Sequence, residues 1–331
     1  MKILINRSDN LGDIVYTLQL AGLLKKFKPS CTVFFLVRDY AAPMFNYATD
    51  VDGTLSWDSL KTLSSKERNK VLKKFDVFIN ARSQSKMAWF AFLAGIKTRI
   101  GNSRRWYNFL LCNNHVAIKH KGLQSHEAEF NARFLEPLIG KTSYTAEELF
   151  NFIQLDKSKA HMLSLSLPTD KTLVICHPAS NGNGREWPLE NFIELINITD
   201  LEGYHFILTG SVSEKNQSDN IEHACPNVSN LAGKLSLNDF IALIASVDVL
   251  IASGTGPLHI AAALGIKTIG LFPPIHALNT QRWGPLFPKA INLELNKACE
   301  VQCQNNDCAC MKNLLPQNVL LNIQSCETVI E

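Results

Sequence analysis

The sequence alternates, along nearly its whole length, between short apolar runs rich in β-branched residues and longer segments with helical periodicity. This alternation is typical of parallel sheets whose strands are joined by crossover helices. The apolar runs are nearly continuous, which predicts strands that are covered on both faces. The predicted strands are residues 3–5, 32–37, 77–79, 172–176, 205–208, 247–251 and 268–272.

Two segments between the strands carry apolar stripes at helical spacing, so we expect both to pack on sheets. The stripes are Tyr16, Leu20, Leu23, Leu24 and Phe27, and Leu237, Ile241, Ile244 and Ala245. The tetrapeptide Gly-Ile-Lys-Thr occurs twice, starting at Gly95 and at Gly265, each time between an apolar helix and an apolar strand. We predict that each Gly ends its helix with a positive φ angle.

The chain length and one polar segment predict the domain organisation. At about 150 residues per domain, 331 residues correspond to two domains. The alternation weakens between residues 140 and 171, where polar residues and Pro168 interrupt it. We therefore predict an α/β protein with two Rossmann-like domains facing a cleft, residues 1–155 and 156–315. A helix in 316–331 follows, in which Val319, Leu320 and Ile323 share one face.

The composition excludes several classes of protein. Apolar residues make up 46% of the chain and charged residues 19%, which excludes a mainly disordered protein. The net charge of +3 is too small for a chain that coats nucleic acid, so we expect no nucleic-acid partner. No apolar stretch approaches the roughly 18 residues of a membrane span, and the apolar start is too short for a signal peptide. We expect a cytoplasmic protein.

Nine cysteines are present, and four of them crowd together near the C-terminus. An odd number in a chain of this size favours free thiols in a reducing compartment. The spacing of Cys299, Cys303, Cys308 and Cys310 matches no familiar zinc pattern. A structural metal, a local cross-link and free thiols all remain open for this cluster.

In open α/β sheets, ligands bind beyond the carboxyl ends of the strands, and the turn at residues 6–13 follows the first predicted strand. Gly12 permits close approach of the backbone, and Asp13 stands in the first turn of a helix. A carboxylate there is favoured as the anion by the exposed N–H groups. Asp13 is therefore either a general base at neutral pH or simply a residue that starts the helix.

Two further turns combine small residues with anion-binding chemistry. The turn at 177–188 places small, flexible residues before Arg185, which suits a phosphate or merely a mobile loop. The turn at 252–259 ends with Pro257 at a first helical position, which suits anion capture at a helix N-terminus. It is neither a P-loop nor a dinucleotide fingerprint. His259 is either a ligand-facing donor or a core histidine.

Taken in order, these turns resemble glycosyltransferase family nine, the heptosyltransferases that build the inner core of lipopolysaccharide. The motifs that carry the resemblance are residues 7–13, His177-Pro178 with Trp187-Pro188, residues 209–211 and residues 254–263. The resemblance implies a fold of the GT-B type, with the nucleotide-sugar on the C-terminal domain and the acceptor on the N-terminal domain. It also implies that the C-terminal helix packs back on the N-terminal domain.

The resemblance further implies an inverting transfer from an ADP-sugar, with heptose as the sugar that the family implies, to a lipopolysaccharide-type acceptor. Asp13 matches the base that deprotonates the acceptor hydroxyl, and Arg185 matches the residue that neutralises the diphosphate. The implied donor and phosphate contacts are Ser180, Arg185, Thr209, Gly210, Ser253, Gly254, Thr255, Gly256 and His259. The expected acceptor contacts are Asn10, Gly12, Arg104 and Arg105.

One position departs from the family pattern. The family usually has an aspartate where this chain has Gly254, so the donor sugar and its base stay open. The alternatives are a glycosyltransferase or epimerase that uses another nucleotide-sugar such as a UDP-sugar, and a nucleotide-sugar-binding protein without catalysis. The sequence Asp50-Val51-Asp52 has the form of a D-x-D metal motif, but its place before Gly53 favours turn capping. We expect no cofactor and no catalytic metal.

A basic and aromatic stretch lies in the N-terminal half. It contains Lys97, Arg99, Arg104, Arg105, Trp106 and Tyr107. The stretch is either a solvated surface or a site for an anionic lipid-linked oligosaccharide, where the enzyme would touch the inner membrane peripherally.

Overall fold

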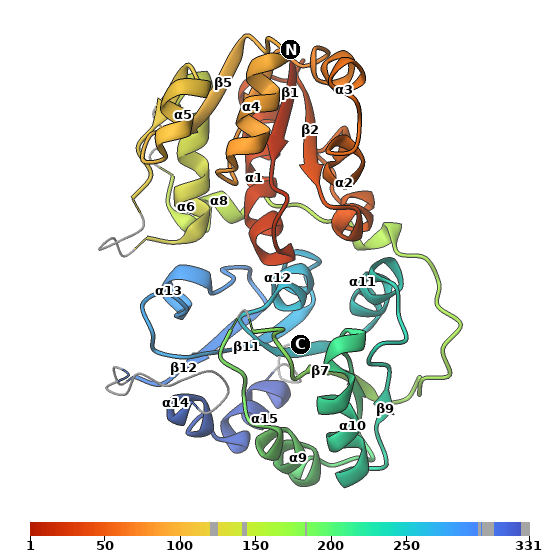
Figure 1. The fold of residues 1–331 in the computed structure, drawn as a ribbon. Helices are drawn as coiled ribbons and strands as arrows, with labels where there is room; N and C mark the ends of the chain where they lie inside the picture. Colours follow the sequence, from red (N-terminus) through yellow and green to blue (C-terminus); the bar gives the residue numbers. More distant parts are fainter. Residues whose placement is uncertain (120–124, 141–143, 183, 297–298, 300–307, 326–331) are drawn as a thin grey trace. The chain divides into compact units, whose positions relative to one another are not determined.

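The computed structural model describes residues 1–119, 125–140, 144–182, 184–296, 299 and 308–325. The chain divides into two compact units, Met1–Lys159 and Ala160–Glu331. Each unit is an α/β layer structure with helices packed around one sheet (Figure 1). The division lies four residues after the predicted boundary at 155.

The N-terminal unit is built on six strands in the order β3-β2-β1-β4-β5-β6. All of its ladders are parallel. The strands are β1 Lys2–Asn6, β2 Thr32–Val37, β3 Gly53–Ser56, β4 Val77–Ile79, β5 Thr98–Asn102 and β6 Asn114–Val116. The strand order reverses direction between β1 and β4, which is the switch point where such sheets bind ligands.

The C-terminal unit repeats this topology. Its sheet has the order β12-β11-β10-β7-β8-β9 and is again parallel, so its switch point lies between β7 and β10. The strands are β7 Thr172–His177, β8 Tyr204–Leu208, β9 Ser229–Asn230, β10 Val249–Ser253, β11 Lys267–Phe272 and β12 Ala290–Glu294. Two doubly wound units are thus confirmed.

Helices connect successive strands of each sheet, and further helices follow the last strand of each unit. In the first unit they are α1 Leu11–Phe27, α2 Trp57–Leu60, α3 Ser65–Leu72, α4 Ser85–Leu93, α5 Trp106–Leu111, α6 Glu127–Ala132, α7 Glu136–Ile139 and α8 Ala146–Phe150. In the second they are α9 Leu189–Ile198, α10 Lys215–Ala224, α11 Leu237–Ser246, α12 Gly256–Ala263, α13 Thr280–Trp283, α14 Ala309–Lys312 and α15 Pro316–Gln324. None of the described helices is long and apolar enough to cross a membrane.

Both copies of Gly-Ile-Lys-Thr end a helix in the same way. Gly95 and Gly265 have φ angles of 70° and 75°, which confirms the prediction. The next residue donates back to the helix: Ile96 N to Ala91 O at 3.2 Å, and Ile266 N to Ala261 O at 3.0 Å. This six-to-one hydrogen bond is the Schellman arrangement, which needs a left-handed residue that glycine supplies without steric cost.

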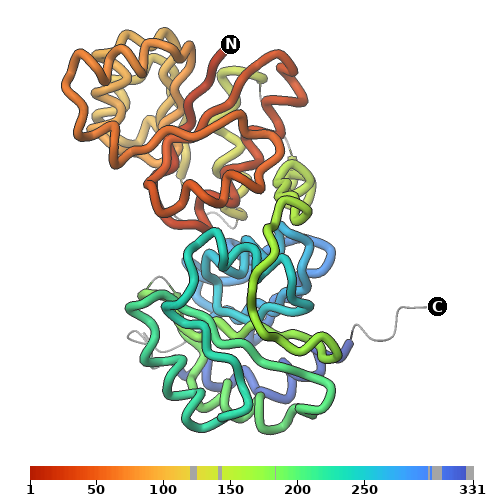
Figure 2. Tube along the Cα trace, turned by 90° about the vertical axis from the view of Figure 1, so that its right-hand side faces the viewer, coloured from red at the N-terminus to blue at the C-terminus, as the bar shows by residue number. Residues whose placement is uncertain are grey.

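Helix α15 packs within the C-terminal unit through its apolar stripe, and the expectation that it packs back on the N-terminal domain stays a prediction. Val319 and Ile323 are buried in the core that also contains Trp187, and the helix contacts α9 and β11. In Figure 2 the dark blue segment of α15 lies among the green and blue segments of the same unit. The ammonium of Lys267 on β11 donates to the carbonyl of Ile323 at 2.8 Å. The apolar stripe was identified correctly, but periodicity does not specify which unit the stripe contacts.

The structure also describes the D-x-D sequence and part of the cysteine cluster. The Asp52 carboxylate accepts hydrogen bonds from the Val33 backbone N–H and from Lys25, both at 2.6 Å, which supports turn capping rather than metal binding. Cys303 lies outside the described residues, and Cys308 is buried in the core of the C-terminal unit. Within the described ranges, no group of three or more His, Cys, Asp or Glu residues is placed to hold a metal ion.

Candidate active site

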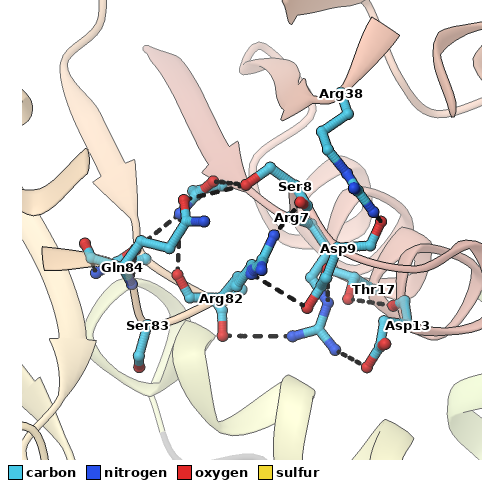
Figure 3. A network of polar contacts seen from close by, with 12 residues as sticks. Arg7, Ser8, Asp9, Asp13, Thr17, Arg38, Arg82, Ser83 and Gln84 are labelled. Carbon is cyan, nitrogen blue, oxygen red and sulfur yellow. Dashed lines mark hydrogen bonds and ion pairs between the residues drawn. The ribbon is translucent and has the colours of Figure 1, made fainter. Parts of the chain in front are cut away.

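At the switch point of the N-terminal unit, the loops that follow β1, β2 and β4 meet around Asp9 (Figure 3). Arg38, after β2, donates to the Asp9 carbonyl at 3.4 Å. Arg82, after β4, donates to the Ser8 carbonyl and lies 4.0 Å from the Asp9 carboxylate. The loop after β1 is therefore clamped from both neighbouring strands.

Arg7 lies at the centre of this network. Arg7 is only 5% exposed, and its guanidinium faces three carboxylates: Asp13 at 2.6 Å, Asp9 at 3.3 Å and Glu127 at 3.8 Å. Burial lowers the pKa of Arg7, but these three anions together raise it above its ordinary value. Arg7 is therefore a fixed cation, and it holds the surrounding carboxylates in place.

Asp13 lies in the first turn of α1, directly against Arg7 (Figure 3). Its Oδ1 accepts the Arg7 hydrogen bond, and its backbone carbonyl accepts one from Thr17. Burial raises the pKa of Asp13, the neighbouring carboxylates of Asp9 and Glu127 add to this shift, and Arg7 opposes it; the resulting pKa is about 6, compared with an ordinary value of 3.8. A carboxyl with this pKa is mostly ionised at neutral pH and is more basic than an ordinary aspartate, as a general base requires.

Sequence analysis missed Glu127, the third carboxylate on Arg7. It is buried at the first position of α6, 120 residues after Arg7, and only the packing of α6 on α1 brings it here. His126 precedes it and caps the helix by accepting a hydrogen bond from Ala128 N at 3.0 Å. The His126 ring also packs against Tyr16 of α1, with the ring centroids 4.9 Å apart. No local signal marks such a long-range contact.

A chain of asparagines holds the strand ends of this unit together. Asn6 Nδ2 donates to Asn80 Oδ1 at 2.9 Å, and Asn80 Nδ2 donates to Asn108 Oδ1 at 3.0 Å. Asn108 in turn donates to the Asn102 carbonyl. All three amide donors are paired, which is typical of a buried polar network that specifies one geometry. Sequence analysis did not identify this network.

The expected acceptor residues separate into two places. Asn10 is the N-cap of α1 and Gly12 is buried in its first turn, so both lie beside Asp13. Arg104 and Arg105 are exposed after β5, at the same edge of the sheet, and neither forms an ion pair among the described residues. The Tyr107 hydroxyl ties this segment to the loop after β4 by donating to the Ser83 carbonyl at 2.6 Å.

In the C-terminal unit, the turns that follow β7 and β10 meet at the switch point. A Cβ atom built on Gly184 would lie 4.0 Å from the Gly254 carbonyl oxygen. The loop containing Gly184 is organised by Glu186, which accepts from Ser180 N at 2.7 Å and from Ser180 Oγ at 2.8 Å. Gln217 on α10 donates to the second oxygen of Glu186. The Ser180 hydroxyl is therefore used to fold the loop, and Arg185 is half-buried beside it.

The turn after β10 carries two buried hydroxyls without partners. Ser253 is 1% exposed and Thr255 is 8% exposed, and neither hydroxyl has a hydrogen-bond partner in the part of the chain that the structure describes. Thr255 is the N-cap of α12, and its side chain does not cap the helix. Buried hydroxyls are normally paired, and exposed N–H groups at a helix N-terminus attract anions. This turn can therefore receive a phosphate group.

The third donor segment, after β8, is tied to β7. The Thr209 hydroxyl pairs with His177 Nδ1 at 3.0 Å, and Gly210 follows it. His177 is stacked on Phe240, and burial lowers its pKa. His259, on α12, is buried with its ring centroid 6.4 Å from that of Trp283. Both histidines therefore belong to the packing of the unit.

The structure gives a physical reason for the glycine at position 254. A Cβ atom there would lie 2.5 Å from a ring carbon of Phe272, the last residue of β11. Carbon atoms in packed interiors approach to about 3.5 Å at best, so no side chain fits at Gly254 unless Phe272 moves. The aromatic ring occupies the space where the resemblance places a carboxylate.

Comparison with known proteins gives one family and one fold. A family model described as glycosyltransferase family 9 (heptosyltransferase) matches residues 66–312. Lipooligosaccharide heptosyltransferase 2 of Haemophilus influenzae is 24% identical over 328 residues, which cover 93% of this chain and 92% of that protein.

Solved structures agree over nearly the whole chain. E. coli ADP-heptose lipopolysaccharide heptosyltransferase II has a TM-score of 0.80 at 20% identity, covering 98% of both chains. E. coli heptosyltransferase WaaC with ADP has a TM-score of 0.73 at 19% identity, covering 98% of this chain and 99% of that one. The predicted GT-B fold is thus confirmed.

Proposed function

The chain belongs to glycosyltransferase family 9, the heptosyltransferase family, and we propose that it transfers a sugar with inversion to a lipopolysaccharide core or related lipid-linked acceptor. The proposed donor is an ADP-sugar, with heptose as the sugar to test first. The observation that carries the proposal is the ion pair between the buried Arg7 and the half-buried Asp13 at the switch point of the N-terminal unit.

Asp13 is the proposed base. Arg7 engages its Oδ1, while Oδ2 accepts no hydrogen bond among the described residues, which leaves that oxygen for a substrate proton. The Asp13 carboxylate takes the proton of the acceptor hydroxyl as the hydroxyl oxygen attacks the anomeric carbon of the donor. The bond from that carbon to the diphosphate breaks, the nucleoside diphosphate leaves, and the configuration inverts. Base catalysis of this kind typically contributes 10²–10⁴-fold.

The leaving group is proposed to bind at the N-terminus of α12. The unpaired hydroxyls of Ser253 and Thr255 support this assignment, because a diphosphate would give both of them acceptors. Arg185 supplies the charge that neutralises the developing anion, and the N–H groups near Gly256 supply further donors. Thr209 and Gly210, at the neighbouring strand end, complete the proposed donor site. We propose that the reaction needs no metal or other cofactor.

Position 254 bears on which nucleotide-sugar is the donor. Gly254 and the adjacent Phe272 ring favour a donor whose sugar does not need a carboxylate at that position. A glycosyltransferase or epimerase acting on another nucleotide-sugar, such as a UDP-sugar, is therefore the second candidate. A nucleotide-sugar-binding protein without turnover is the third.

Calorimetric titration with ADP, UDP and GDP tests the donor assignment. We expect ADP to bind at least about tenfold more tightly than UDP or GDP. Preference for UDP would replace the ADP-sugar proposal with the second candidate. Product analysis with the selected nucleotide-sugar then separates transfer to an acceptor from epimerisation, and tight binding without any product would support the non-catalytic alternative.

The acceptor is proposed to be an anionic lipid-linked oligosaccharide that the N-terminal unit binds. Asn10 and Gly12 lie beside the proposed base, and Arg104 and Arg105 provide exposed cations at the same sheet edge for phosphate or carboxylate groups. A cytoplasmic enzyme with such an acceptor would meet it at the inner membrane surface, and peripheral contact with that surface is part of the proposal.

A further inference from the structure

Helices α4 and α5 expose large apolar side chains at the same helical spacing. On α4, Trp89, Phe92 and Leu93 are 42–48% exposed, and on α5, Trp106, Phe109 and Leu110 are 68–76% exposed. Each triad occupies positions i, i+3 and i+4, which lie on one face of a helix. Single exposed apolar residues are ordinary, but two triads on neighbouring helices are the kind of patch that marks an interaction site.

Contacts between the helices join the two triads into one surface. α4 and α5 pack against each other (Figure 1). Arg99 bridges them: its guanidinium lies 5.4 Å from the centroid of the Phe92 ring, and its Nε donates to the Leu111 carbonyl at the end of α5 at 2.7 Å. We call the six exposed residues of the two triads the α4–α5 surface.

The charge of the surrounding sequence has one sign. Residues 77–126 contain eight Lys and Arg residues and no Asp or Glu, although the whole chain has 33 basic and 30 acidic residues. The cations nearest to the triads in sequence are Lys86, Lys97, Arg99, Arg104 and Arg105. The apolar triads therefore lie in a strongly cationic part of a nearly neutral protein.

We propose that the α4–α5 surface docks the N-terminal unit on an anionic lipid bilayer. Tryptophan and phenylalanine favour the region of the headgroups, and lysine and arginine beside them bind anionic lipids. A second copy of the chain is a poor occupant, because it would bring a second cationic surface against the first. The inference rests on the proposed function only for the lipid-linked nature of the acceptor.

Cosedimentation with vesicles tests this docking. Wild-type protein is expected to bind vesicles that contain phosphatidylglycerol, to bind phosphatidylcholine vesicles weakly, and to lose affinity as salt rises. Replacing Phe109 and Leu110 together by Ser should weaken binding about tenfold, because two exposed apolar side chains no longer enter the interface. The matched control replaces Met162 and Leu321, which are 97% and 64% exposed in the other unit, and should bind as the wild type does.

Two variants with reversed charges test whether lysines near the triads contribute to vesicle binding. Lys86→Glu with Lys97→Glu should weaken binding to anionic vesicles about twentyfold or more, at roughly fivefold for each cation lost. The same charge change at the exposed lysines Lys157 and Lys289 should cost much less, because these two residues are not among the cations nearest to the triads in sequence. Circular dichroism confirms folding of each variant, which is expected because all replaced apolar side chains are exposed.

The outcomes separate docking from transfer. Phe109→Ser with Leu110→Ser should keep ADP affinity and transfer to a water-soluble, deacylated acceptor, and lose transfer only to acceptor embedded in vesicles. Unchanged vesicle binding by this variant, or a wild type that binds neither kind of vesicle, would overturn the docking proposal and leave the proposed sugar transfer standing. A dimer that the variant converts to monomer would likewise overturn it, by assigning the surface to a second copy.

Discussion

Replacing Asp13 by Asn should stabilise the protein at neutral pH while it abolishes turnover. The carboxylate is half-buried beside Asp9 and Glu127, and Arg7 opposes the rise in pKa that burial and these two carboxylates cause. Asn keeps the shape of the side chain and can still accept the Arg7 hydrogen bond, but it carries no charge. The variant therefore resembles wild-type protein in which Asp13 is protonated.

The magnitude follows from the shift in pKa. The pKa of Asp13 rises from its ordinary value of 3.8 to about 6, so the native state binds this proton more tightly than the unfolded chain does. The free energy of unfolding therefore falls as pH rises from about 4 to about 6. At about 1.4 kcal/mol per pH unit, the loss is at most about 3 kcal/mol and is complete above pH 6. D13N lacks this loss.

The assay compares unfolding of the N-terminal unit at two pH values. Urea-dependent hydrogen exchange of peptides from β1 and α1 reports on that unit alone. D13N should exceed the wild type by about 2–3 kcal/mol at pH 7.5 and by close to zero at pH 4. Asp58→Asn is the matched control: the side chain of Asp58 is 34% exposed, and the hydrogen bond from Lys61 lowers its pKa, so no gain is expected at pH 7.5.

One result would refute this reasoning. If D13N is less stable than the wild type at pH 7.5, the Arg7 ion pair outweighs burial, and the pKa of Asp13 lies below its ordinary value. The pH dependence of the wild type would then change sign, with stability lost as pH falls through the lowered pKa. Such an Asp13 would also be a weak base at neutral pH, which would undermine its proposed role.

Three further changes test the C-terminal unit. Gly254→Ala should lower the free energy of unfolding by about 1–3 kcal/mol, and adding Phe272→Leu should recover part of it in urea titrations; a neutral single change would show that the ring yields freely. Ser253→Ala should change the free energy of unfolding by no more than about 0.5 kcal/mol, since the hydroxyl has no partner among the described residues, but should weaken ADP binding about tenfold in calorimetry. Unchanged ADP affinity would show that the diphosphate does not bind at this hydroxyl. Glu186→Ala leaves the N–H of Ser180 without its acceptor, so exchange in residues 178–186 should rise and ADP affinity fall, and unaltered exchange would contradict its loop-holding role.

The sequence predicted the central strands of both sheets because parallel strands that are buried on both faces consist of continuous apolar residues. All seven predicted strands are present. Of the five strands that were missed, β3, β6, β9 and β12 are sheet edges, and β5 is polar at both ends. Such strands lack a continuous apolar run, because an edge strand is only partly covered and needs less burial to stay in place.

The candidate site was predictable where chemistry follows directly from a strand. Each of three site residues lies at the end of a predicted strand or in the segment directly after it: Asp13, Arg185 and Ser253. Glu127 and Glu186 were not predicted from the sequence. Glu127 reaches Arg7 only through the packing of helices, and Glu186 acts by accepting hydrogen bonds inside its own loop. The apolar stripe of α15 predicts a buried face in the same way, but it does not specify which elements that face contacts.

The measurement that tests the central claim most directly is product formation by wild type and D13N. ADP-heptose and a water-soluble acceptor are the first substrates, and NMR of the product gives the configuration at the new linkage. We predict that the wild type yields product with the inverted configuration and that its rate rises with pH through a pKa near 6. D13N should lose at least about 10²-fold in rate, with its affinity for ADP nearly unchanged. Near-normal turnover by D13N, or a product that retains the donor configuration, would contradict these predictions.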